Sequence, residues 1–346
     1  MPGSDGRSRR ATVAWLAASA AAFAAAWRQI LFPADMGSFI LGLDLAQFIA
    51  AGRLVQSGRG SLLYDQAAEY QERVALLGVG RADVFPDFIA PPSLAVLYVP
   101  FGWLPFSAAE GVHRVLALGA FGLAMYLVRR WSPAPWWAVA MLGIASPWSL
   151  INVQTGQTTP FMVLLWAASA RLVAAGKPNW AAGVVGLGLV KPQLVWPGLV
   201  LLAVRGGWRG AMLAATAQYL VAWLVTADPL WPRAWLAEAA RVSAGIPGGP
   251  EAGPVRAALA LLPVIIWVGA RTTEWRGLAT LLLPSISLTF VPYPFAYYWL
   301  LGVLPALATL HALGRFGETR GWERLRRPAP GSPRDPETKD VTGASG

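Results

Sequence analysis

Lys191 and Pro192 lie in the middle of an apolar stretch that runs from Trp180 to Val204. A lysine ammonium at bilayer depth is costly unless it meets water, a counter-charge or an anionic ligand. The adjoining proline removes a backbone donor and interrupts the helix, which a membrane tolerates only where protein or a polar cavity covers the exposed backbone. The pattern therefore indicates an anion-binding site. The alternative is that the lysine snorkels or pairs with a buried carboxylate, for which Asp44 is the obvious partner.

Asp44 begins a polar segment, DLAQFIAAGRLVQSGRGSLLYD over 44–65, that follows the first apolar run of the chain. A partly desolvated carboxylate in this position can act as a general base toward a hydroxyl group. The alternative is that Asp44 caps the helix that follows it, with Gly42 and Leu43 forming the turn into that helix. The two roles are compatible with each other.

Other hydrogen-bonding side chains gather in two short segments. In NVQTGQTTP (152–160), Asn152 and Gln157 stand among three threonines, which fits either an ordinary polar turn or contacts to a sugar or phosphate. In VPYPFAYYWLLGVLP (291–305), Tyr293, Tyr297 and Tyr298 fit either an aromatic belt at a membrane boundary or a surface that stacks on a sugar.

A third group of polar side chains has helical spacing. Asp65, Glu69 and Glu72 share one helix face near Arg73. This arrangement most simply predicts a solvated face, with an acceptor or metal role for Asp65 as the alternative.

The elements that must position these side chains are membrane helices. Of the 346 residues, 55% are hydrophobic and 13% are charged, whereas soluble domains carry roughly 25% charged residues. We predict an all-α polytopic membrane protein with about ten membrane helices. The apolar runs lie around 11–32, 91–105, 109–128, 136–151, 157–173, 180–204, 210–227, 254–271, 277–292 and 296–313.

The net charge of +10 indicates topology rather than nucleic-acid binding, because the basic residues occur in the tails and short loops and not on one amphipathic face. The positive-inside tendency places both termini, and the loops around Arg205 and Arg271, in the cytoplasm. We expect a cytoplasmic tail at 1–10, a transmembrane domain at 11–317 and a disordered cytoplasmic tail at 318–346. Two outer loops, 33–90 and 228–253, should carry interfacial helices.

One part of this topology has two solutions. Four basic residues would face outward if every apolar run from 91 to 204 crossed the membrane: Arg129, Arg130, Arg171 and Lys177. Either the positive-inside tendency is violated there, or the runs at 91–105 and 180–204 enter and return on the same side.

The chain offers little for a metal or a redox cofactor. It has no cysteine, and its two histidines, His113 and His311, are too few for a multi-histidine centre. We assign no metal site and no particular cofactor, and a divalent metal, which the sequence leaves open but does not support, would need carboxylate ligands.

Five motifs follow one another along the chain. They are an Asp-led segment with a later Gly and Tyr-Asp (Asp44, Gly58, Tyr64, Asp65), a double proline (Pro91, Pro92), a Gly-Gln turn (Gly156, Gln157), a Lys-Pro-Gln break (Lys191, Pro192, Gln193) and a Pro-Tyr segment (Pro292, Tyr293). In this order they resemble glycosyltransferase family 87, membrane enzymes of the GT-C superfamily that use polyprenyl-phosphate sugars. The resemblance covers about residues 40 to 310.

The resemblance implies a GT-C-like bundle with its active site at the outer face of the cell membrane and a catalytic carboxylate in the first outer loop, which Asp44 matches. It implies transfer of a sugar, for which we expect mannose, from a polyprenyl-phosphate donor to a lipid or glycan hydroxyl by a single inverting displacement. Lys191 and Arg53 would bind the donor phosphate. The sugar and acceptor would contact Asn152, Gln157, Gln193, Tyr64, Asp65, Tyr293, Tyr297 and Tyr298.

Two positions depart from the family pattern. Ala90 stands where an aromatic residue commonly precedes the proline pair, and Tyr298 stands where many relatives carry an acid. Two other functions are compatible with the sequence. A transporter or flippase of a lipid-linked or anionic substrate would also use a broken helix with a buried lysine, and an inactive relative would serve as a scaffold for a partner.

Overall fold

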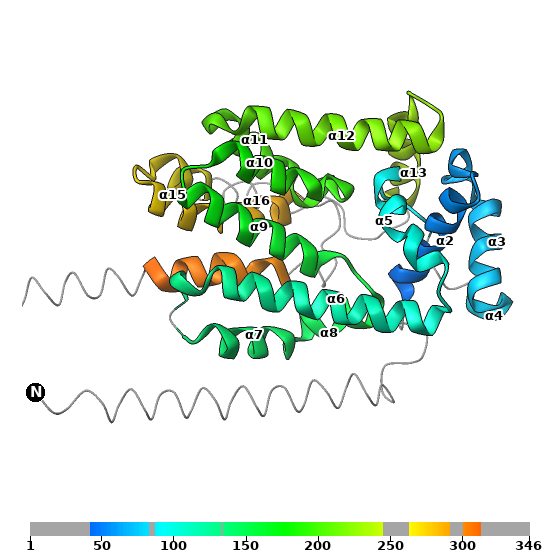
Figure 1. Cartoon of the computed structure of the whole chain (residues 1–346), viewed down its shortest axis with the longest axis horizontal. Coiled ribbons are helices and arrows are strands. Elements are labelled where there is room, and N and C mark those ends of the chain that lie inside the picture. Colours follow the sequence, from blue (N-terminus) through cyan, green and yellow to red (C-terminus); the bar gives the residue numbers. More distant parts are fainter. Residues whose placement is uncertain (1–41, 83–86, 133, 245–262, 291–299, 313–346) are drawn as a thin grey trace, which may run out of the picture.

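The computed structural model describes residues 42–82, 87–132, 134–244, 263–290 and 300–312 (Figure 1). Within these ranges all regular secondary structure is helical, which confirms the predicted all-α class. The α-helices are α2 (Leu43–Gln56), α3 (Gln66–Leu77), α4 (Val79–Ala82), α5 (Pro92–Gly102), α6 (Phe106–Leu127), α7 (Trp136–Ile144), α8 (Pro147–Thr155), α9 (Thr159–Ala174), α10 (Pro178–Gly186), α11 (Trp196–Leu202), α12 (Trp208–Thr226), α13 (Trp231–Ala244), α15 (Thr273–Thr280) and α16 (Leu283–Phe290). Residues 263–269 and Leu300–Ala312 are also helical. The predicted run at 11–32 and the tails lie outside the described residues.

The bundle has two chemically different ends (Figure 1). Helices α2 to α5 gather at one end with α13, and most of the acidic residues of the described chain lie there. Helix α15 marks the other end, which carries the basic loops. Arg205 of this second end donates to the carbonyl oxygen of Val268, and Arg130 lies near both Arg171 and Glu274. We refer to these as the α2 end and the α15 end.

Residues 178–207 form a hairpin. A Cβ atom added at Gly207 would lie 2.8 Å from the carbonyl oxygen of Pro178, so the chain returns to the place from which α10 began. Lys191 lies between the two arms, in an extended conformation (φ −133°, ψ 74°) of the kind that a following proline imposes. The hairpin agrees with the alternative in which the run at 180–204 enters the membrane and returns on the same side, because Lys177 and Arg205 lie at the same end of the bundle.

Helix α5 also departs from a simple crossing. It is bent by 118° relative to α6, with Leu104 and Pro105 at the junction. It packs closely against α2, where a Cβ atom added at Gly52 would lie 2.7 Å from the backbone of Tyr98. The run at 91–105 is therefore a separate element that covers α2.

No helix in the described part of the chain is by itself both long enough and apolar enough to cross a membrane. Three pairs of helices joined at a bend meet the requirement together, judged by length and composition alone. These pairs are Pro92–Gly102 with Phe106–Leu127, Trp136–Ile144 with Trp148–Thr155, and Trp196–Thr226 with Trp231–Val242.

The Gly-Gln turn fixes the beginning of α2 against the α8–α9 junction. Gly156 ends α8 with φ +76°, and a Cβ atom there would lie 2.4 Å from the Cβ of Leu45. The backbone N–H of Gly42 donates to the carbonyl oxygen of Gln154 at 2.7 Å. Glycine at 156 is thus required both by the left-handed backbone and by the close approach of α2.

We predict that Gly156→Ala lowers the free energy of unfolding by about 3 kcal/mol, because a left-handed alanine costs roughly 1–2 kcal/mol and overpacking adds a similar amount. Gly176→Ala is the matched control, since Gly176 has φ +72° but open space around its Cα. That variant should lose only about 1 kcal/mol. Denaturant unfolding followed by circular dichroism measures both, and equal losses would contradict the packing argument.

Candidate active site

Asp44 lies in the first turn of α2 and does not cap it. The helix begins at Leu43, and its N-cap is Gly42 in the left-handed region at φ 73°, with no side-chain capping hydrogen bond. The capping alternative for Asp44 is therefore wrong. Its carboxylate accepts a hydrogen bond from Nε2 of Gln47 at 2.9 Å, and the positive end of the helix dipole favours a negative charge at this position.

Lys191 reaches the same place from the hairpin. Its Nζ donates to Oε1 of Gln157 at 2.5 Å and lies 5.1 Å from the ring centroid of Phe48. Phe48 is one helical turn beyond Asp44 on α2, so the two side chains share a face. Gln157 and the charge of Lys191 both lower the pKa of the Asp44 carboxyl, so the two residues act on that group. The cluster thus brings together three residues that come from three separate elements.

The charges of this cluster are largely removed from solvent. Asp44 is 7% exposed and Lys191 is 6% exposed. Burial raises the pKa of Asp44, and the positive charge of Lys191 together with hydrogen bonds from Gln157, Thr155 and Gln47 offsets part of that rise. A carboxylate with a raised pKa is a stronger base than an exposed one, and it acts as a base only at a pH above that pKa.

The arrangement is a buried base beside a buried cation, which suits a reaction that takes a proton from one group and leaves negative charge on another. A family model for glycosyltransferase family 87 matches residues 88–323. The chain belongs to glycosyltransferase family 87. Membership confirms the predicted family and the enzyme class, and it favours sugar transfer over transport. The match includes Gln157 and Lys191 of this glycosyltransferase and begins after Asp44. No curated protein and no solved structure matches the chain.

Several residues of the cluster in this family 87 glycosyltransferase are absent from the sequence-based prediction. Tyr98 packs 5.1 Å from Phe48, centroid to centroid, and its hydroxyl lies 3.0 Å from Nε2 of His113. Gln47 is three positions after Asp44, and a helix brings residues at this spacing together, so helical periodicity could have predicted the contact between them. Tyr98 and His113 meet only because α5 bends back from α6.

Three other predicted residues lie around this cluster or apart from it. Arg53 is nine positions from Asp44 on the same helix, a rise of about 13 Å, and its Nε donates to the carbonyl oxygen of Gly102 at 3.3 Å. The role of Arg53 at the donor phosphate therefore stays a prediction. Gln193 lies in the turn directly after Lys191 and is half-buried. Asn152 is buried one turn before Gly156, and its Nδ2 donates to the carbonyl oxygen of Trp148 at 2.7 Å.

The remaining predicted residues occupy other places. Asp65 is the N-cap of α3 and accepts from the backbone N–H of Ala68 at 2.9 Å. The hydroxyl of Tyr64 donates to the carbonyl oxygen of Ala90 at 2.9 Å. These contacts hold the first predicted outer loop together. The predicted tyrosines of the last span, Tyr293, Tyr297 and Tyr298, lie outside the described residues.

The prediction of a solvated face on α3 is wrong for Glu69 and Arg73. They are 1% and 4% exposed, and Arg73 donates to Glu69 at 2.9 Å. Glu69 also accepts from the backbone N–H of Phe88, which is a reason for its burial. Asp87 bridges Arg73 at 3.1 Å and Arg241 of α13 at 2.6 Å. The two predicted outer loops are therefore docked onto each other.

Glu69→Ala should lower the free energy of unfolding by about 3 kcal/mol, because it leaves the Arg73 guanidinium buried without its closest acid. Glu72→Ala is the matched control on the same helix, since its partner Arg59 has a side chain that is 42% exposed. The control should lose less than about 1 kcal/mol. Thermal unfolding of the purified variants measures the difference, and similar losses would mean that burial of the Glu69 pair is energetically unimportant.

The described ranges contain no group of three or more histidine, aspartate and glutamate side chains placed to hold a metal ion.

Proposed function

We propose that this glycosyltransferase moves mannose from a polyprenyl-phosphate donor to a hydroxyl group of a lipid or glycan at the extracytoplasmic face of the cell membrane. One observation carries the proposal. Lys191 donates to Gln157, and both residues act on the Asp44 carboxyl by lowering its pKa, so a buried base and a buried cation belong to one site. A hydroxyl acceptor needs the base, and a phosphate leaving group needs the cation.

The proposed reaction is a single displacement. Asp44 takes the proton of the acceptor hydroxyl while the acceptor oxygen attacks the anomeric carbon of the sugar. The new carbon–oxygen bond forms as the bond to the phosphate oxygen breaks, and the electron pair of that bond leaves with the lipid phosphate. Lys191 stabilises the charge that develops there. Attack from the face opposite the phosphate inverts the anomeric configuration.

The membrane placement rests on family and charge. Members of family 87 are membrane proteins. In this chain the short basic loops at Lys177, Arg205 and Arg271 lie together at the α15 end, which supports the cytoplasmic placement of that end. We therefore place α2, α3 and α13 outside, both termini in the cytoplasm, and the hairpin at 178–207 as a re-entrant element within a GT-C-like bundle.

The test is transfer in reconstituted vesicles. The full chain is incorporated with radiolabelled polyprenyl-phosphate mannose and a total membrane lipid extract as acceptor, and new labelled product is separated by chromatography. We expect product from the lipid-linked donor and none from nucleotide-linked mannose in a parallel reaction. Product from the nucleotide donor alone would contradict the donor class, and movement of the donor across the bilayer without any product would favour transport.

A further inference from the structure

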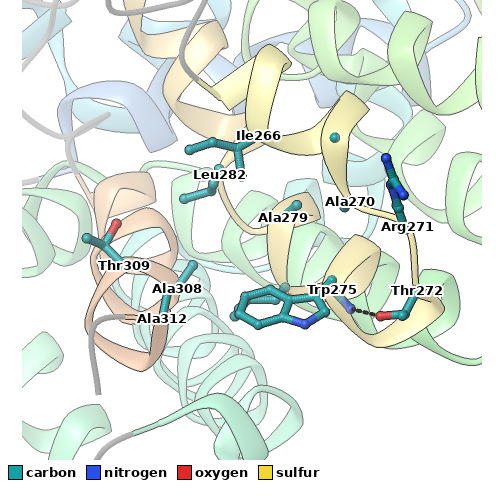
Figure 2. Close-up of a pocket in the computed structure, with 12 residues that line it drawn as sticks. Ile266, Ala270, Arg271, Thr272, Trp275, Ala279, Leu282, Ala308, Thr309 and Ala312 are labelled. Atoms are coloured by element: carbon teal, nitrogen blue, oxygen red, sulfur yellow. Dashed lines mark hydrogen bonds between the residues drawn. The ribbon is translucent and has the colours of Figure 1, made fainter. Parts of the chain in front are cut away.

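A cavity lies beside α15 (Figure 2), and α15 is at the end of the bundle opposite α2, which carries Asp44 (Figure 1). Its volume is about 460 Å³, which is within the range of roughly 300–1,000 Å³ typical of ligand pockets. It is bounded by the helix at 263–269, by α15 and by Leu300–Ala312. The side chains that line it are almost all apolar, with Trp275 facing Ala308 and Ala312 across the space (Figure 2).

The edge of this cavity is basic. Arg271 lines the edge, is exposed, and forms no salt bridge with any carboxylate of the described chain. Two other arginines fix the loop that carries it, because Arg276 donates to the carbonyl oxygen of Ala270 at 3.1 Å and Arg205 to that of Val268 at 2.7 Å. The acid of this neighbourhood, Glu274, lies near Arg130. The guanidinium of Arg271 is thus the cation presented to whatever occupies the cavity.

We propose that this cavity binds one anionic phospholipid of the surrounding membrane, with an acyl chain inside the cavity and the phosphate on Arg271. Basic pockets between membrane helices on the cytoplasmic side bind the head groups of anionic lipids in this way. The inference rests on the proposed membrane location and not on the proposed transfer reaction.

Charge and position argue against two other occupants. The segment of this chain that follows Ala312 carries five arginines and two glutamates over 313–327, so like charge would oppose its binding beside Arg271. A polyprenyl-phosphate donor bound here would hold its sugar at the end of the bundle opposite Asp44. A membrane anionic phospholipid carries the opposite charge to Arg271 and has no sugar that must reach Asp44.

Native mass spectrometry of the full chain, released from detergent with added lipid, tests the proposal. Phosphatidylglycerol and phosphatidylcholine with the same acyl chains are compared. We expect one phosphatidylglycerol per chain and a preference of about fivefold over phosphatidylcholine, which corresponds to one arginine near the head group. Arg271→Gln should abolish the preference. Arg209→Gln, which removes an exposed arginine outside the cavity, should leave it unchanged.

A second variant tests the apolar part of the site. Gly269 lines the cavity, and a Cβ atom there meets nothing within 4 Å, so Gly269→Phe should fit and reduce binding of both lipids. Gly119→Phe, at an equally open exposed position of α6, is the control. Equal retention of both lipids by the natural protein, no effect of Arg271→Gln, or stronger retention of a polyprenyl phosphate would overturn the proposal. Arg271→Gln should retain mannose transfer, so failure here is distinguishable from failure of the proposed function.

Discussion

Asp44→Asn reduces the rate of mannose transfer by about 1,000-fold if the carboxylate is the general base of the reaction. Asparagine keeps the size of the side chain and an oxygen that can accept from Gln47, but it cannot take the proton of the acceptor hydroxyl. Donor binding should persist, because Lys191 and Gln157 remain. Initial rates with saturating labelled donor, in detergent or in vesicles, measure the change.

The control for this variant is Asp228→Asn. It makes the same chemical change at an exposed position of the other predicted outer loop, where the side-chain oxygen that accepts from the backbone N–H of Leu230 at 2.7 Å is retained. Its rate should stay within about twofold of the natural enzyme, because the local hydrogen bond is preserved. Full turnover by Asp44→Asn would remove the proposed base.

Lys191→Met should reduce the transfer rate by about 100- to 1,000-fold, because the developing charge on the lipid phosphate loses its stabilising cation. The variant should also change the pH dependence of the reaction. Burial already raises the pKa of Asp44, and Lys191 offsets part of that rise. Without the lysine the pKa of Asp44 rises further, so the base is protonated at a higher pH and the acid limb of the rate profile moves upward in pH.

Two further variants distinguish the loss of the positive charge at position 191 from a general loss of folded, active enzyme. Lys191→Arg keeps the positive charge and should restore part of the rate with little movement of the acid limb. Lys177→Met removes an exposed lysine at the α15 end and should change neither quantity. A lost rate with an unmoved acid limb in Lys191→Met would mean that the lysine does not act on Asp44.

Lys191 was predictable as a site residue because it is a charged group in the middle of an apolar run. Such a placement is costly without a partner, so it indicates that a partner must lie nearby. Asp44 and Gln157 lie in polar segments beside apolar runs, where a polar side chain carries no such cost. The meeting of the three residues became evident only in three dimensions.

The errors have a common physical cause. Glu69 and Arg73 have the i, i+4 spacing of a solvated ion pair and of a buried one alike. Their burial is decided by Phe88, 19 positions later, and by α13, whose Arg241 reaches Asp87 from 154 positions away. The role of Arg53 at the donor phosphate stays a prediction, because the hydrogen bond from its Nε to the carbonyl oxygen of Gly102 does not test it. The sequence allowed either a crossing or a return of the run at 180–204, and the close approach of Gly207 to Pro178 agrees with a return.

The most direct test of the central claim is an experimental structure with a polyprenyl phosphonate analogue of the donor, which cannot transfer its sugar. We predict that the phosphorus atom lies within about 5 Å of Lys191 Nζ and that the anomeric carbon lies beside the Asp44 carboxylate, near the spacing of a reactive complex. An analogue bound elsewhere, for example with its phosphonate on Arg271, while Asp44 and Lys191 stay closed around Gln157, would contradict the account.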